Sequence, residues 1–297
     1  RRWLGRARDM AEELDDAYLR GLADACEAGI CVTTGRWAEA AELGLAAPPQ
    51  LRAQGAPAGW ESTAAVSLAR TGMMFAGDLA RLRPLVERHA RAAEEVGDRF
   101  AGTYATVHGW FTAAMDDDCA AGRRRIGESL ARWSHLGFHA VHFWGLYGEL
   151  QYDLYEGQPA RGLARLDAAG PALRRSRILS MQFYRLLLLA TEASLALGAG
   201  DRRRAASRAR TLRRAGPAYA DALGLATESG LERDRSRARA KARAAADAFE
   251  GCGMRLHAHA ARASVGDDGH AEMAALGIRR PERWAQLVVP GTGLNGA

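Results

Sequence analysis

Turn signals followed by a helix start recur along this chain at intervals of about forty residues. They are 42, 40, 40 and 43 residues apart, at Gly35-Arg36-Trp37, Gly77-Asp78-Leu79, Asp117-Asp118-Cys119, Gly157-Gln158-Pro159 and Gly200-Asp201-Arg202. Helix-ending pairs, Val96-Gly97 and Leu136-Gly137, are also separated by 40 residues and fall about twenty residues after the first set. A fixed period of this length is typical of stacked helix pairs, none of which can bury its apolar face alone.

The spacing inside the repeats is helical. Apolar residues recur every three or four positions, as at Leu79, Leu82 and Val86, and no window shows the alternation expected of a strand. The residue types at the expected helix starts fit, with N-caps at Asp78, Asp118 and Asp201 and a first-turn Pro159. We predict an all-α chain, a right-handed α-solenoid of antiparallel helix pairs with a period of about 40 residues.

The predicted solenoid has two segments. Residues 1–215 carry the regular repeats, and residues 216–297 form a degenerate final repeat and cap, with helices expected over 218–226, 231–249 and 254–265. Residues 46–59, which contain three prolines, predict a long loop or a broken helix, and Pro84 predicts the start of a helix or a kink in it.

Lys241 is the single lysine of the chain, so the other basic residues are arginines. It has neither a phosphate-loop nor a kinase context, which excludes those nucleotide sites. The four cysteines match no metal or disulfide spacing and indicate small apolar residues in a reducing cytoplasm. The apolar stretch 178–199 contains Arg185 and Glu192 and predicts a buried helix, not a membrane span. Because the first residue is Arg1, we expect a segment of a longer protein.

The repeats resemble tetratricopeptide-like units, and the tail resembles the C-terminal end of bacterial multidomain signalling proteins. In that family, a serine/threonine kinase domain or regulatory region precedes an AAA-like ATPase module, and tetratricopeptide-like helices end the chain. The repeat pattern covers the whole sequence, whereas the motif covers the last fifty residues. The residues that carry it are Phe249, Gly251, Gly253-Met254-Arg255-Leu256, Ala258, Ala260-Ala261-Arg262, Gly266, Gly277-Ile278, Pro281, Arg283 and Pro290-Gly291. No catalytic residue of the family has a counterpart here.

The densest aromatic segment predicts a partner-binding groove, because a solenoid's inner helices are where a ligand docks. The same spacing also fits a buried core. Three histidines, His135, His139 and His142, would need one continuous helix to share a metal, and Gly137 interrupts it, so we expect no metal site. The expected groove residues are Trp110, His139, His142, Phe143, Trp144, Tyr147 and Tyr184.

Positive charge gathers near the end of the chain. From residue 201 to 255 there are fourteen Arg or Lys and seven Asp or Glu, a net +7, whereas the rest sums to −1. This favours a solvated face or a contact with an acidic domain, and a nucleic-acid surface is the alternative. The predicted basic surface comprises Arg204, Arg208, Arg235, Arg239 and Arg243.

Two further motifs are explained more simply. Asp116-Asp117-Asp118 resembles an aspartate-rich magnesium motif, but Ala120 replaces the carboxylate such a motif needs, and a helix cap fits better. Residues 291–296 spell a dinucleotide fingerprint without the strand and helix it requires.

From these observations we expect a non-enzymatic interaction or sensor module that requires no cofactor. By the resemblance, it would be an arm of a bacterial kinase or ATPase signalling protein. The expected partner is a protein or peptide, including the protein's own ATPase or kinase domains. The alternatives are a small-molecule-sensing arm of an ATP-dependent transcription activator, with a closed pocket beneath Trp144 and Tyr147, and an arginine-rich solenoid that binds nucleic acid. No membrane partner is expected.

Overall fold

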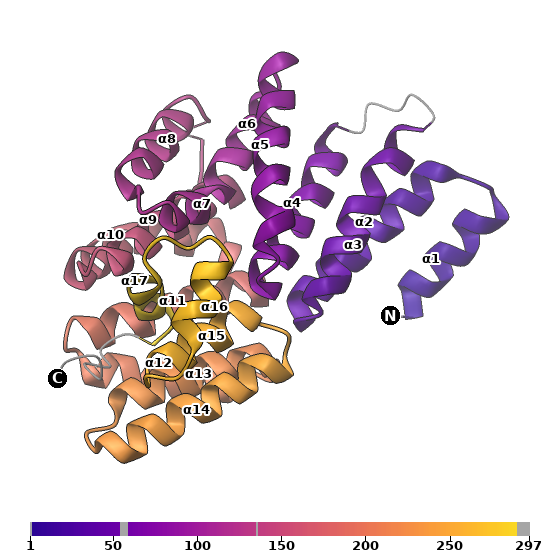
Figure 1. Ribbon diagram of the computed structural model, residues 1–297. Helices are drawn as coiled ribbons and strands as arrows, with labels where there is room; N and C mark the ends of the chain where they lie inside the picture. The colour runs from indigo at the N-terminus through magenta and orange to yellow at the C-terminus, as the bar shows by residue number, and fades with distance from the viewer. Residues whose placement is uncertain (1, 54–58, 135, 290–297) are drawn as a thin grey trace. The chain divides into compact units, whose positions relative to one another are not determined.

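The computed structural model describes residues 2–53, 59–134 and 136–289, and every regular element within these ranges is a helix (Figure 1). Helices pack in sequential neighbouring pairs, which confirms the predicted all-α, α-solenoid class. The chain divides into two compact units, residues 1–105 and 106–297, which we call the N-terminal and C-terminal units. The boundary between the two units falls within α6. The boundary predicted at residue 216 separates regular repeats from a degenerate final repeat, and it stays a prediction.

The N-terminal unit is built around the packing of α2 on α3 and of α3 on α4. Trp37 begins α3 and stacks on Phe75 near the end of α4, with ring centroids 4.7 Å apart. Both side chains are buried. The helices of this unit are α1 (Arg2–Glu13), α2 (Ala17–Thr34), α3 (Trp37–Arg52), α4 (Gly59–Ala76), α5 (Leu79–Glu95) and the part of α6 (Arg99–His108) that ends at residue 105.

The C-terminal unit continues the sequential packing and then returns on itself. Its last helix contacts both α9 and α15, and the Arg279 backbone N–H donates to the Met115 carbonyl at 2.9 Å (Figure 1). After the end of α6 come α7 (Trp110–Met115), α8 (Cys119–Ala131), α9 (Ala140–Tyr155), α10 (Pro159–Ser176), the short 3₁₀ helix η1 (Ile178–Ser180), α11 (Gln182–Gly198), α12 (Arg202–Arg213), α13 (Ala218–Leu231), α14 (Arg235–Gly251), α15 (Arg255–Ala263), α16 (Gly269–Ala275) and α17 (Pro281–Val288).

The predicted helix starts are confirmed. The carboxylates of Asp78, Asp118 and Asp201 each accept a hydrogen bond from the backbone N–H three residues on, which satisfies a donor that the helix leaves unpaired. Pro159 occupies the first turn of α10. Asp118 therefore explains the aspartate triplet as a turn and cap.

Three of the prolines that were expected to interrupt or begin a helix lie inside one: Pro48 and Pro49 in α3, and Pro84 in α5. Helix α3 runs through Pro48 to Arg52 and α4 begins at Gly59, so the long loop, one of the two alternatives expected over 46–59, is wrong for its first half. Burial of Leu51 holds this last turn, where a lost hydrogen bond matters least. Helix α5 begins at Leu79 and includes Pro84, whose side chain is exposed. Pro57 lies outside the described residues.

The C-terminal helices were predicted in the right order with shifted bounds. Helix α13 extends to Leu231, five residues beyond its predicted end, and α14 therefore begins at Arg235. The apolar stretch 178–199 forms η1 and the largely buried α11, as predicted. Within the described ranges, no helix has the combination of length and apolar character needed to cross a bilayer.

His257 makes the stability of the C-terminal unit sensitive to acid. It lies on α15 with its ring 5.3 Å from that of Phe249, and burial lowers its pKa to about 4. Because the unfolded chain takes up this proton near pH 6.5, stability present at pH 7 is lost as the pH falls from about 6.5 to 4. We expect His257→Gln to remove about 2 kcal/mol of that loss. Urea unfolding at pH 7 and pH 4.5 checks this, with the exposed His139→Gln as control; equal pH dependence of both variants would contradict it.

Candidate functional site

The predicted groove aromatics form a buried cluster around α9. Trp110, Phe143, Trp144 and Tyr147 are 5%, 0%, 2% and 8% exposed. The Trp144 ring lies 5.6 Å from that of Tyr147 and 4.2 Å from that of the buried His108. These contacts are those of a hydrophobic core.

The expectation that these four aromatic residues line an open groove is therefore corrected. Helix α9 contacts α7, α8, α10, α11 and α17, so that neighbours cover most of its circumference. Two hydrogen bonds lie within the cluster and its neighbours: the Trp144 indole N–H donates to the Tyr184 hydroxyl, and Tyr147 forms a hydrogen bond with Thr191. Burial raises the pKa of Tyr147 and of Tyr184, so both phenols are neutral at physiological pH.

The remaining groove residues lie at the edge of this cluster. Tyr184 and His142 are half-buried, and His139 is exposed. The His139 backbone N–H donates to His142 Nδ1 at 3.0 Å, so His142 satisfies a donor at the start of α9. In the described residues no group of three potential metal ligands comes together, and His135 lies outside them.

Two residues of the predicted basic surface are committed to ion pairs between helices. Arg204 Nε donates to Glu192 at 2.6 Å and Arg208 Nε donates to the same carboxylate at 2.8 Å. Arg204 also binds Asp167 on α10 and lowers the pKa of that carboxyl group. The Glu192 carboxylate on α11 is 10% exposed, so these pairs hold α12 against α11 instead of forming an open basic surface.

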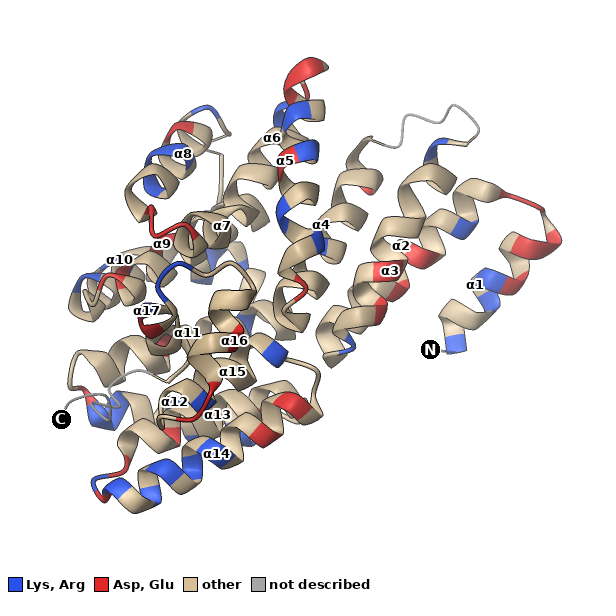
Figure 2. Ribbon diagram, viewed as in Figure 1, with Lys and Arg blue, Asp and Glu red and all other residues tan. Residues whose placement is uncertain are grey.

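The other predicted basic residues lie on α14, where blue residues follow the helix in Figure 2. Arg235 and Arg239 are exposed. Arg243 is exposed as well, but its guanidinium binds Asp267 through two hydrogen bonds of 3.1 and 3.0 Å. The structure therefore leaves Arg235 and Arg239 as the accessible part of the predicted basic surface.

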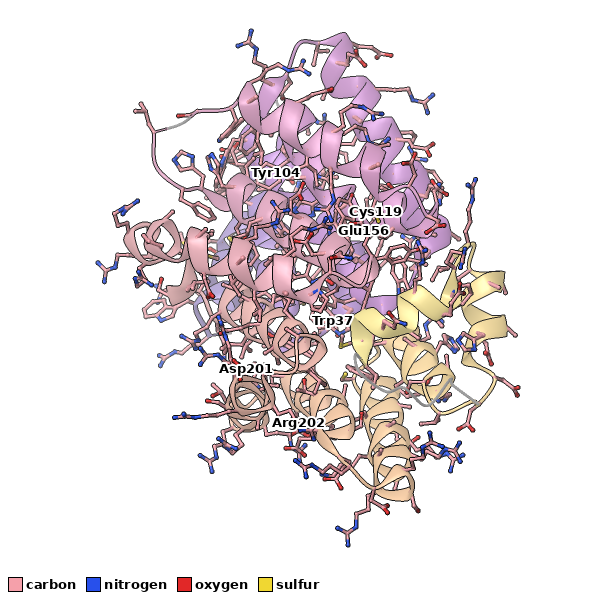
Figure 3. The ribbon with its side chains drawn as sticks, turned by 90° about the vertical axis from the view of Figure 1, so that its left-hand side faces the viewer. Trp37, Tyr104, Cys119, Glu156, Asp201 and Arg202 are labelled. Atoms are coloured by element: carbon pink, nitrogen blue, oxygen red, sulfur yellow. The ribbon has the colours of Figure 1, made fainter. Side chains whose placement is uncertain are left out.

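A cleft of about 560 Å³ lies between α11 and α12, and we call it the α11–α12 cleft. Its cationic wall is made of Arg185, Arg210 and Arg214, which are exposed and form no ion pair with other described residues. Helix α12 starts after the cap Asp201, with Arg202 as its first residue (Figure 3). The remaining lining residues are Leu186, Leu189, Ser207, Thr211 and Ala215.

Sequence reasoning noted the cleft arginines but did not bring them together. Arg210 and Arg214 lie within the positively charged segment 201–255, and Arg185 interrupts the apolar stretch 178–199. The usable signal is the spacing of Ser207, Thr211 and Arg214, which places them on one face of α12. The position of Arg185 opposite that face depends on helix packing.

Two of the four cysteines, Cys119 and Cys252, have thiols that burial holds in the unreactive form. Cys119 lies beside Glu156 (Figure 3), and burial raises the pKa of its thiol to about 12. Burial likewise raises the pKa of Cys252 to about 11. Both thiols are therefore protonated at neutral pH, and the thiolate is the reactive form.

The dinucleotide-like residues 291–296 lie outside the described residues. No protein-family model, curated protein or solved structure matches this chain.

Proposed function

We propose that this chain is a non-catalytic helical-repeat interaction module that binds an acidic segment of a protein partner in the α11–α12 cleft. The observation that carries the proposal is the cleft itself, which is lined by Leu186, Leu189 and three exposed arginines that form no ion pair with other described residues. Arginine binds carboxylates through paired hydrogen bonds and is a frequent anchor residue at protein interfaces. Leu189, which is half-buried, offers apolar contact to a side chain between the acidic residues of the ligand.

The resemblance of the tail to bacterial signalling proteins suggests where the module acts. In that setting the acidic segment would belong to another signalling protein or to the protein's own kinase or ATPase domains. The four free cysteines are compatible with the reducing cytoplasm expected for such a protein.

The distribution of ion pairs favours this cleft over the arginines that already bind carboxylates of the chain. Arg204, Arg208 and Arg243 are bound to carboxylates of the chain, so a partner would have to displace them. Arg210 and Arg214 require no such exchange. Arg210 lies in the last turn of α12 and Arg214 follows directly after its end, a spacing that matches an extended acidic peptide lying along the cleft.

Binding of a fluorescent peptide with repeated Glu-Glu-Leu units tests the proposal. Anisotropy at 50 and 150 mM salt should show binding that Arg210→Glu plus Arg214→Glu weakens by at least about tenfold. The double variant Arg235→Glu plus Arg239→Glu changes the charge equally on α14 and should alter the affinity less than about twofold.

A single-stranded oligonucleotide of equal charge serves as the competing probe. If it binds more tightly than the peptide, and the α14 variant abolishes that binding, the nucleic-acid alternative is correct. Failure of the peptide to bind, or equal effects of the two double variants, would also overturn the proposed function.

A further inference from the structure

Arg70 on α4 is a buried charged side chain in the N-terminal unit, and no described residue forms a hydrogen bond with it. It is 1% exposed, and none of its three guanidinium nitrogens has a partner among the described residues. Burial lowers its pKa to about 10, so the group stays positively charged at neutral pH. A buried guanidinium is normally paired, because removing its five N–H donors from water is costly. The side chain therefore calls for an acceptor that the described residues do not supply.

His89 on α5 supplies a second unsatisfied polar atom near Arg70. Its Nδ1 is buried and has no hydrogen-bond partner among the described residues. Burial, and next the charge of Arg70, lower the pKa of His89 to about 4. The imidazole is therefore neutral, and its Nδ1 can carry a proton and donate it in a hydrogen bond.

The groups that act on Arg70 and His89 carry excess positive charge. Tyr104 of α6, labelled in Figure 3, interacts electrostatically with Arg70 and is half-buried, as is His89. The charges that act on His89 are those of Arg70, Arg52 and Asp98, which are two arginines and one acid. All these residues belong to the N-terminal unit.

We propose that Arg70 and His89 form a binding site for a small oxyanion, such as inorganic phosphate or the phosphate or carboxylate group of a metabolite. The planar guanidinium would donate two parallel hydrogen bonds to the anion, and the His89 ring would donate a third. The site is separate from the α11–α12 cleft, which lies in the C-terminal unit. Its ligand would order the packing of α4, α5 and α6 in the N-terminal unit by satisfying these buried donors.

Calorimetric titration of the full chain with sodium phosphate, at ionic strength held constant with sodium chloride, tests the site. We expect saturable binding of phosphate to the unaltered chain and a loss of affinity greater than about 30-fold in Arg70→Leu. Arg70→Lys keeps the charge but not the planar fork, and should bind about tenfold more weakly. Arg88→Leu, an exposed arginine next to His89, is the matched control and should bind like the unaltered chain.

Parallel titrations with sulfate and with acetate distinguish a tetrahedral from a planar oxyanion. Glycerol 3-phosphate, an organic phosphate ester, shows whether the site accepts more than the free ion. If Arg70→Leu does not fold, Arg70→Lys and His89→Gln carry the test, since each should weaken binding while preserving the fold. Absence of saturable binding by all four anions, or equal binding by Arg70→Leu and the unaltered chain, would overturn the proposal.

Discussion

Asp153→Ala is expected to destabilise the C-terminal unit by about 3 kcal/mol, because it removes a completely buried carboxylate that three arginines share. The Asp153 carboxylate on α9 is completely buried and accepts hydrogen bonds from three arginines. Arg123 of α8 donates at 2.9 Å, and Arg161 and Arg165 of α10 donate at 2.7 and 3.0 Å. One side chain therefore joins α9 to the helices before and after it.

The loss of stability in Asp153→Ala is limited because two neighbouring acids pair with the same arginines. Glu149 pairs with Arg123 and Arg165, and Glu156 pairs with Arg123 and Arg161. Asp153→Asn keeps the size of the side chain and an acceptor oxygen, so its expected cost is smaller, about 1–2 kcal/mol.

Urea unfolding followed by circular dichroism measures these differences. Asp167→Asn is the matched control. The Asp167 side chain is 59% exposed, so its ion pair with Arg204 should contribute less than about 1 kcal/mol to the free energy of unfolding. If Asp153→Ala costs no more than Asp167→Asn, the three arginines do not depend on the buried carboxylate.

Features of the fold that depend on residues close together in the sequence could be predicted, whereas features that depend on packing between helices could not. Asp78, Asp118 and Asp201 cap helices through hydrogen bonds to residues three positions away, so their role is visible in a short window of sequence. The bounds of α13 were less predictable, because its continuation to Leu231 depends on packing against α12 and α14.

The functional residues depend on contacts that sequence spacing does not contain. Trp144 and Tyr147 were compatible with a groove or a core, and the decision rests on how many helices surround α9, including the returning α17. Glu192 was visible as one acid in an apolar stretch. Its two partners, Arg204 and Arg208, follow only after a turn that reverses the chain. Arg70 gave no signal, because its isolation becomes evident only when the neighbouring side chains are placed.

The crossing of α3 and α4 supports a second large expected effect, the destabilisation of the N-terminal unit by Gly44→Ala or Gly72→Ala. A Cβ atom at Gly44 would lie 2.6 Å from the Ala65 carbonyl oxygen, and one at Gly72 would lie 2.5 Å from that of Trp37. The backbones of the two helices are therefore in close contact at two points. Gly44 of α3 provides the space at one point, and Gly72 of α4 provides it at the other. Either methyl group would force the helices apart and disturb the stacking of Trp37 on Phe75.

We expect each substitution to cost about 2–4 kcal/mol, even though alanine favours the helix over glycine by about 1 kcal/mol. Gly29→Ala on α2 provides the control, because its Cβ would meet only Leu68 Cδ1 at an ordinary 3.8 Å and should stabilise the chain by about 0.5–1 kcal/mol. Denaturant unfolding gives the sign of each change, and hydrogen exchange of the α3 and α4 amides locates it. The same chemical substitution is thus expected to act in opposite directions, and a stabilising Gly72→Ala would show that the helices do not approach this closely.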